Sequence, residues 1–208
     1  MRLVFASNNA HKLAEVRAIM PEGVEVLSLH DIGFEADIEE TGTTLAENSL
    51  IKAETVYDWI SAFNSQHSTL ILDGVFADDT GLEIDALDGE PGVYTGRWAE
   101  RETGVHLDEM ATYAANRVKA LRELDGKSNR GCQFKTVITL IRQGKTVQVE
   151  GIVRGTMTTM EHGEGGFGYD PIFMPDGYDK TFGELPASVK NGISHRARAL
   201  QELVKLLN

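Results

Sequence analysis

Short apolar runs alternate with stripes of apolar residues at helical spacing along the N-terminal part of the chain. Arg2 to Ala6 predicts a short buried strand, which ends at the polar turn Ser7-Asn8-Asn9. Leu13, Val16 and Met20 then recur at i, i+3 and i+7, the spacing of one helix face. A second strand is expected from Val24 to Leu29, after Pro21-Glu22-Gly23 ends the helix. This order predicts a βαβ-type opening.

The same two periods continue to the C-terminus. The expected elements are a helix from about Leu45 to Phe63, a strand from Leu70 to Ala77, a helix striped by Leu107, Met110, Ala114, Val118 and Leu121, strands at Cys132–Arg142 and Thr146–Val153 around a Gln143-Gly144-Lys145 turn, and a closing helix striped by Ile193, Ala197, Leu200, Val204 and Leu207. We therefore expect a single domain over residues 1–208 of the α/β (mixed α+β) class. Its long mixed β-sheet would be flanked by helices, with two lobes around a central substrate cleft.

The composition is that of an ordinary soluble globular protein, since 41% of the 208 residues are hydrophobic and 25% are charged. A formal net charge of −12 argues against binding to a nucleic-acid backbone, so a small anionic ligand would need local cations or a divalent metal. No apolar run reaches the roughly 20 residues that cross a bilayer, and the first residues do not resemble a signal peptide. Cys132 is the only cysteine, which predicts a buried thiol in a cytoplasmic protein.

The segment Ser7-Asn8-Asn9-Ala10-His11-Lys12 places small polar residues between a strand and a helix. Backbone N–H groups and the helix dipole at such a position favour an anion, and Lys12 adds a positive charge. The simpler interpretation is that Ser or Asn caps the helix, and the segment alone favours capping.

Two further segments carry clustered carboxylates. Glu39 and Glu40 precede the helix that begins near Leu45, and Asp78-Asp79-Thr80 follows an apolar strand. Carboxylate oxygens suit Mg²⁺, although an acidic turn is the alternative. Thr44-x-x-Glu47 forms a capping box, and Asn48 and Lys52 lie away from the apolar stripe of that helix, facing either a ligand or water.

The segment Gly165-Gly166-Phe167-Gly168-Tyr169-Asp170-Pro171 combines glycines, aromatic rings and a carboxylate. These residue types suit a pocket for a flat polar ring, and a glycine-rich hairpin turn is the alternative. Asp170 is expected to accept from a ring N–H, Arg196 to donate to a ring carbonyl, and Phe167 or Tyr169 to stack on the ring. Lys190, His195 and Arg196 complete this set, which together with an anion site and a metal site describes a nucleotide.

Five motifs in this order resemble the inosine/xanthosine triphosphate pyrophosphatase family, a Ham1-like family. They are Ser-Asn-Asn-x-x-Lys, Glu-Glu-Thr-Gly with Glu-Asn-Ser-Leu-Ile-Lys-Ala, Ala-Asp-Asp-Thr-Gly-Leu, Gly-Gly-Phe-Gly-Tyr-Asp-Pro-Ile-Phe and Ile-Ser-His-Arg. The resemblance spans nearly the whole chain. It implies a two-lobed α/β fold and a homodimer.

The resemblance also implies an activity, namely Mg²⁺-dependent hydrolysis of ITP, dITP or XTP to monophosphate and pyrophosphate, which removes these nucleotides from the pool. Asp79 would be the catalytic carboxylate, and Glu39 and Asp79 would hold the metal. The expected substrate-binding residues are Ser7, Asn8, Asn9, Ala10, His11, Lys12, Lys52, Thr80, Phe167, Gly168, Tyr169, Asp170, Lys190, His195 and Arg196.

Other functions stay open at this point. A non-catalytic protein that senses modified purine nucleotides would keep the base pocket and the anion site, but would not need Glu39 and Asp79 together. A Maf-like pyrophosphatase or a phosphatase that releases orthophosphate would share the nucleotide substrate class and differ in the base or in the product.

Overall fold

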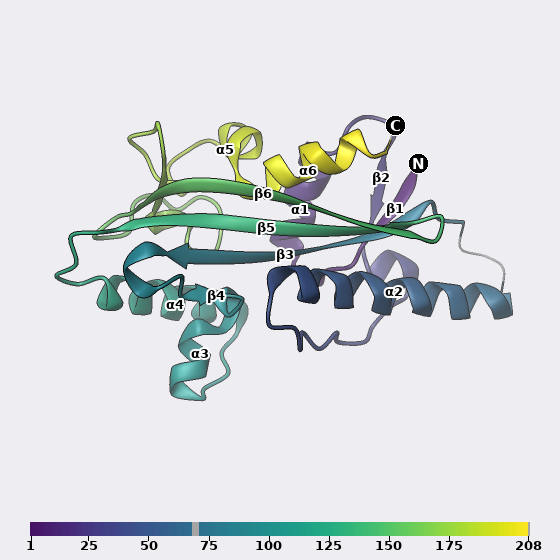
Figure 1. Cartoon of the computed structure of the whole chain (residues 1–208), viewed down its shortest axis with the longest axis horizontal. Coiled ribbons are helices and arrows are strands. Elements are labelled where there is room, and N and C mark those ends of the chain that lie inside the picture. The colour runs from purple at the N-terminus through teal and green to yellow at the C-terminus, as the bar shows by residue number, and fades with distance from the viewer. Residues whose placement is uncertain (68–70, 208) are drawn as a thin grey trace. The chain divides into compact units, whose positions relative to one another are not determined.

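The protein is described here by a computed structural model that covers residues 1–67 and 71–207. The helices are α1 (Ala10–Ile19), α2 (Leu45–His67), α3 (Trp98–Thr103), α4 (Glu109–Glu123), α5 (Ala187–Ile193) and α6 (His195–Lys205), and the strands are β1 (Arg2–Phe5), β2 (Glu25–Leu27), β3 (Gly74–Ile84), β4 (Pro91–Gly92), β5 (Gly131–Arg142), β6 (Lys145–Met157) and β7 (Phe173–Pro175) (Figure 1). The strand order is β2-β1-β3-β5-β6-β7, with β4 paired to β3. Parallel pairs (β1 with β2 and β3) and antiparallel pairs (β3 with β4, β6 with β7) occur together, which confirms the predicted mixed sheet.

The chain forms two compact units. Unit 1 contains residues 1–79, 136–151 and 196–208, and unit 2 contains residues 80–135 and 152–195. The strands β3, β5 and β6 each contribute residues to both units. The central cleft and the single domain over residues 1–208 stay predictions.

In unit 1, successive side chains of β1 and β3 belong to two different core clusters. Val4 and Val75 belong to a core cluster that includes Ala53 and Val56 of α2. Leu3, Phe5 and Phe76 belong to another cluster, which includes Val16 of α1 and Leu200 and Leu203 of α6. Since successive strand residues point to opposite faces, α2 covers one face of β1 and β3, and α1 and α6 cover the other (Figure 1).

Unit 2 has a core of its own. Leu82 and Ile84 of β3, Cys132 and Phe134 of β5, and Phe173 of β7 pack together with Trp98, Ala120, Leu124 and Phe182. Cys132 is fully buried, as predicted, and burial raises the pKa of its thiol to about 12.

The predicted stripe of α4 is wrong. The side chains of Met110 and Val118 are 67% and 61% exposed, and Leu107 lies before the first helical residue. The buried residues of α4 are Asn116 and Ala120. Asn116 accepts the N–H of Ala99 and donates to the carbonyls of Thr95 and Gly96, so the buried face of the helix carries a polar side chain and lies away from the predicted stripe.

Other boundaries also differ from the prediction. The third strand begins at Gly74 and continues through Asp78 and Asp79 to Ile84, so these carboxylates lie within a strand and not in a turn after it. Leu70, where the strand was expected to begin, lies outside the described residues. Ser194 separates α5 from α6, so the last helix is shorter than the stripe suggested.

The Gln143-Gly144 turn between β5 and β6 is confirmed, with φ of 52° and 71° at its two residues. Both angles are positive, as in the two-residue turns that join antiparallel strands. Within the described residues, no helix is both long enough and apolar enough to span a membrane.

The buried hydroxyl of Ser49 joins α2 to two strands. It lies 3.0 Å from the carbonyl oxygen of Ala77 and accepts the N–H of Thr139 at 2.9 Å. Replacing Ser49 by alanine would leave that buried N–H without its acceptor, so we expect Ser49→Ala to lower the free energy of unfolding by about 1–3 kcal/mol. Urea denaturation measures this loss.

Ser61 provides the matched control on the same helix. Its hydroxyl is exposed and bonds only the carbonyl of Tyr57, one turn earlier. Ser61→Ala should stay within about 0.5 kcal/mol of the unmodified protein. An equal loss in both variants would contradict the assigned role of Ser49.

Candidate functional site

The turn after β1 shapes the N-terminus of α1. The hydroxyl of Ser7 accepts the N–H of Asn9 at 3.2 Å, and the side-chain oxygen of Asn9 accepts the N–H of Lys12 at 2.9 Å. Asn9 is therefore the helix cap, as the simpler interpretation proposed. Asn8, Ala10 and His11 are exposed beside it. Capping leaves the helix N-terminus with its partial positive charge, which still suits an anion.

The two neighbouring aspartates of β3 have different partners because the strand alternates. The side chain of Asp78 lies on the same face of β3 as Phe76, where α1 and α6 pack. The side chain of Asp79 lies on the same face as Val75 and Ala77, where α2 packs. Their side chains therefore meet separate sets of cations. Asp78 is only 1% exposed and Asp79 only 6% exposed.

Asp78 belongs to a buried ion-pair network. Its carboxylate accepts from the ammonium of Lys12 and from Nε of Arg196, each at 2.9 Å. Burial alone would raise the pKa of Asp78, but Lys12 and Arg196 outweigh it and hold the pKa well below its usual range. Asp78 is thus a permanently charged anchor for two cations.

Arg196 is fixed by carboxylates on two sides. Its Nη1 donates to Glu15 of α1 at 2.5 Å while Nε bonds Asp78, and its side chain is 1% exposed. Burial alone would lower the pKa of Arg196. Asp78 and Glu15 raise it by more than burial lowers it, so the guanidinium stays charged. Arg196 belongs to unit 1, and Phe167, Asp170 and Lys190 belong to unit 2. The predicted donation from Arg196 to a base stays a prediction.

Asp79 meets a different arrangement on the α2 face. The ammonium of Lys52 lies 2.9 Å from Asp79 Oδ1 and 2.6 Å from Glu40 Oε1, and the Asn48 amide lies 3.4 Å from Asp79 Oδ2. Burial raises the pKa of the Asp79 carboxyl, although Lys52 and Lys12 oppose the change. Burial would lower the pKa of Lys52, but Asp79 and Glu40 raise it. Asp79 therefore holds a proton more readily than Asp78.

Glu40 reaches this arrangement and Glu39 does not. Glu39 is exposed, whereas the Glu40 carboxylate shares the Lys52 ammonium with Asp79. The contacts around Lys52 therefore include Glu40, and the metal pair of Glu39 and Asp79 stays a prediction. Glu47 has the structural role of a capping box, because its carboxylate accepts the backbone N–H groups of Thr43 and Thr44.

The carboxylates of Glu40 and Asp79 fit one divalent cation. Both approach a single ammonium, so they already converge on one position of positive charge. No group of three or more His, Cys, Asp or Glu residues with metal-site geometry occurs in residues 1–67 and 71–207. Mg²⁺ commonly uses one or two carboxylates together with substrate phosphates, which this pair can offer.

In unit 2, Asp170 organises the glycine-rich segment. Its Oδ2 accepts the N–H of Phe167 at 2.7 Å and the ammonium of Lys190 at 2.5 Å. The ammonium of Lys190 also lies 4.8 Å from the centre of the Phe167 ring. Gly166 has φ of 71°, and a Cβ there would overlap the Asp170 carboxylate. The segment is therefore a loop wrapped around a carboxylate, not a hairpin turn.

Tyr169 and His195 belong to the core of unit 2. Tyr169 is 4% exposed and its hydroxyl donates to the carbonyl of Thr95. The stacking of Phe167 or Tyr169 on a ring stays a prediction. Burial raises the pKa of Tyr169 well above its usual range. The His195 ring stacks on Phe134 with centroids 4.7 Å apart. Thr80 is half-buried in β3.

Sequence reasoning missed Glu15, Glu40 and Asp170 in their observed roles. Glu15 follows Lys12 by three residues and so lies on the same face of α1. This spacing was the only local pattern that could have placed Glu15 near the site. Its pairing with Arg196 joins residues 181 positions apart, which no local pattern indicates.

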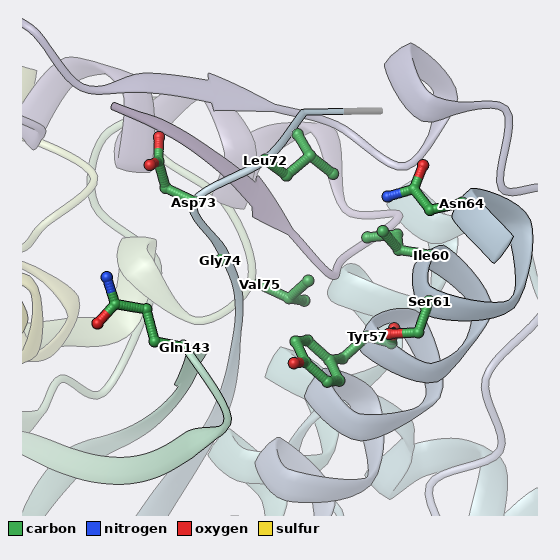
Figure 2. Close-up of a pocket in the computed structure, with 9 residues that line it drawn as sticks. All are labelled: Tyr57, Ile60, Ser61, Asn64, Leu72, Asp73, Gly74, Val75 and Gln143. Atoms are coloured by element: carbon green, nitrogen blue, oxygen red, sulfur yellow. The ribbon is translucent and has the colours of Figure 1, made fainter. Parts of the chain in front are cut away.

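A pocket of about 390 Å³ lies elsewhere in unit 1, and Figure 2 shows the side chains that line it. They are Tyr57, Ile60, Ser61, Asn64, Leu72, Asp73, Gly74, Val75 and Gln143. This lining contains none of the predicted site residues and no lysine or arginine, so it does not suit a polyphosphate.

Fold and site define an α/β protein in which a helix N-terminus and buried lysines accompany paired carboxylates on a central strand. The chain belongs to the Ham1 family, whose model matches residues 3–206. This confirms the family resemblance drawn from the motifs.

Similar proteins extend over essentially the whole chain. A dITP/XTP pyrophosphatase of Flavobacterium johnsoniae is 45% identical over 100% of this chain and 98% of its own length. The solved structure of the Staphylococcus aureus Ham1 protein matches with a TM-score of 0.80 and 35% identity, covering 100% of this chain and 98% of the other. A Mycobacterium abscessus nucleoside-triphosphatase / dITP/XTP pyrophosphatase structure matches with a TM-score of 0.69 and 37% identity, covering 98% and 99% of the two chains. The predicted enzyme class, a hydrolase of the pyrophosphatase type, is confirmed.

Asp78→Asn should remove the negative charge that compensates Lys12 and Arg196 while preserving the shape of the side chain. We expect a loss of about 3–5 kcal/mol in unfolding free energy at pH 7, because buried cations are left without their carboxylate. The depressed pKa of Asp78 gives stability that is present above its unfolded pKa, near 4, and is lost as the pH falls further.

The difference between the unmodified protein and Asp78→Asn should therefore be constant from pH 7 to about pH 5 and shrink below about pH 4. Urea denaturation at several pH values measures it. A difference that grows on acidification would contradict the low pKa of Asp78.

Proposed function

We propose that the protein hydrolyses purine nucleoside triphosphates with a 6-keto base, namely dITP, ITP and XTP, to monophosphate and pyrophosphate. The observation that carries this proposal is the pair of aspartates on β3, one held as a permanent anion by two cations and the other with a raised pKa beside Lys52 and Glu40. The names of the relatives supply the base and the bond. A raised pKa suits a carboxylate that takes a proton from water during the reaction.

The residues divide into two functional sets in this proposal. The N-terminus of α1 with Ser7, Asn8, Asn9, Ala10 and His11, together with Lys12 and Lys52, binds the triphosphate, and Thr80 completes this set. Phe167, Gly168, Asp170 and Lys190 bind the base, with Phe167 stacking on the ring. Tyr169 and His195 support this second set from the core.

Glu40 and Asp79 would hold the Mg²⁺, which would neutralise charge on the phosphates when it is bound. Asp79 orients the attacking water and accepts its proton. Lys52, which is shared by both carboxylates, exchanges its contacts for the triphosphate when substrate binds. Asp78 keeps Lys12 and Arg196 in place and takes no proton, because its pKa lies far below neutral pH.

Base selection follows from hydrogen-bonding chemistry. Hypoxanthine and xanthine present an acceptor at O6 and a donor at N1, whereas adenine presents the reverse. The ammonium of Lys190 can donate to O6, and the carboxylate of Asp170 can accept from N1–H. Adenine would leave these buried groups unsatisfied, at a cost of about 1–3 kcal/mol for each.

We further propose that the protein acts as a cytoplasmic homodimer that removes damaged purine nucleotides from the pool. The exposed apolar side chains of Met110, Val118, Val105 and Leu107 in unit 2 offer a surface for association. Neither the partner nor the location affects the chemistry assigned to Asp79.

Product analysis tests the function. Purified protein with Mg²⁺ is incubated separately with dITP, XTP, dGTP and ATP, and the phosphorus products are identified by ³¹P NMR. We expect monophosphate and pyrophosphate from dITP and XTP and little turnover of the other two. Tight binding without turnover would favour a nucleotide sensor, and release of orthophosphate would mean that a different bond is cleaved.

Variants of neighbouring glutamates test the metal ligands. Glu40→Gln should lower kcat at least about 10-fold and raise the Mg²⁺ concentration needed for half-maximal rate, because one ligand charge is lost. Asp79→Asn should lower kcat about 10²-fold or more.

Glu39→Gln is the matched control, since it removes the same charge one residue away from an exposed position. It should stay within about 2-fold of the unmodified enzyme. A larger effect of Glu39→Gln than of Glu40→Gln would favour Glu39, the ligand predicted from the sequence, over Glu40.

A further inference from the structure

The helix α4 contributes two side chains to the glycine-rich loop of unit 2. Nη1 of Arg117 donates to the carbonyl oxygen of Gly168 at 3.0 Å, and its Nε lies 2.9 Å from the carboxylate of Glu161. Four residues earlier on the same helix face, the ring of Tyr113 lies 5.9 Å from the ring of Phe167. One helix face thus contacts the loop of residues 161–168 at its two ends, Glu161 and Gly168, and also contacts the ring of Phe167 within it.

The loop needs such support because its backbone is unusual. Gly163, Gly166 and Gly168 all have positive φ, of 78°, 71° and 61°. Glycine has greater conformational freedom than other residues, so a loop rich in glycine loses more entropy when it is held in one conformation. Fixed contacts at defined points must offset that loss.

Asp170 and Gly183 supply contacts on one side of the loop. The Asp170 carboxylate accepts the N–H of Phe167, and the carbonyl of Gly183 accepts the N–H of Gly165. These bonds fix the middle of the loop. On the other side, the guanidinium of Arg117 spans from Glu161 to Gly168 and fixes the ends.

The helix itself is rigidly attached to unit 2. Asn116, next to Arg117, donates to the carbonyl of Thr95, which also accepts the hydroxyl of Tyr169 at 3.0 Å. Helix and loop therefore share one backbone acceptor. This common attachment makes α4 a fixed support from which Arg117 can hold the loop.

We propose that Arg117 is a positioning residue for base recognition, which sets the placement of Phe167 by holding Gly168 and Glu161. The proposal rests on the proposed function, because Phe167 is taken to stack on the purine. Arg117 does not touch the base in this assignment. Its effect is expected on KM, since the loop must otherwise be ordered at the moment of binding.

The test compares Arg117→Met with Arg122→Met. Both variants remove an arginine ion pair from α4, but Arg122 is exposed and pairs with Glu102 and Glu123, away from the loop. Hydrogen–deuterium exchange of residues 161–168 is measured in both variants, and kcat and KM are measured for dITP and XTP.

In Arg117→Met we expect amide exchange in residues 161–168 to be at least about 3-fold faster. The KM should rise about 3- to 10-fold with kcat nearly unchanged, because only substrate binding has to order the loop. Arg117→Lys should lie between the two, since an ammonium can hold one of the two acceptors but not both. Arg122→Met should change neither quantity.

Unchanged exchange in Arg117→Met would overturn the proposal. So would faster exchange with an unchanged KM, or a fall in kcat of the same size in both variants. An unmodified protein that does not hydrolyse dITP or XTP would overturn the proposed function instead, and the exchange measurement, which needs no substrate, separates the two results.

Discussion

The alternation of side chains along β3 is the constraint on which the candidate site depends. Asp78 and Asp79 are chemically identical and adjacent, yet the pleat sends one toward α1 and α6 and the other toward α2. The first meets Lys12 and Arg196, and its pKa falls. The second is buried beside Lys52, which Glu40 also contacts, and burial raises its pKa although Lys52 and Lys12 oppose the change. The backbone of one strand thus gives two chemically equal carboxyl groups opposite shifts in pKa.

The polar groups buried in the two units serve different ends. In unit 1, ion pairs such as that of Arg196 with Glu15 and Asp78 hold charged side chains at fixed positions. In unit 2, hydrogen bonds from Asn116 and Tyr169 to one backbone carbonyl hold a helix and a loop together. In unit 1 buried charges are paired with opposite charges, whereas in unit 2 the loop is held by neutral groups together with the charged side chains of Asp170 and Arg117. Each device satisfies buried polar atoms that would otherwise destabilise the fold.

Much of the fold could be predicted from the sequence because hydrophobic periods of two and of about 3.6 residues act locally. The strands around the Gln143-Gly144 turn and the helix beginning at Leu45 illustrate this. The stripe of α4 failed because Asn116 satisfies three backbone groups of the segment from Thr95 to Ala99, and apolar periodicity cannot reveal such a partner. Prediction of the site from the sequence was limited for the same reason, because its contacts join residues far apart in the chain. Motifs located the aspartates and the glutamates, but only the three-dimensional contacts showed which cations surround Asp78 and Asp79 and that Glu40 reaches Lys52.

The course of β3 through both aspartates has a consequence for how this chain can change over time. Substituting Asp for another residue alters one partner set, but inserting or deleting a single residue before Asp78 would exchange the faces of both carboxylates at once. The carboxylate now held by Lys12 and Arg196 would then lie beside Lys52, and the carboxylate now beside Lys52 would lie beside Lys12 and Arg196. Length variation between Gly74 and Asp79 is therefore expected to be far less tolerable than sequence variation, and the loops that precede the strand must absorb every change in length.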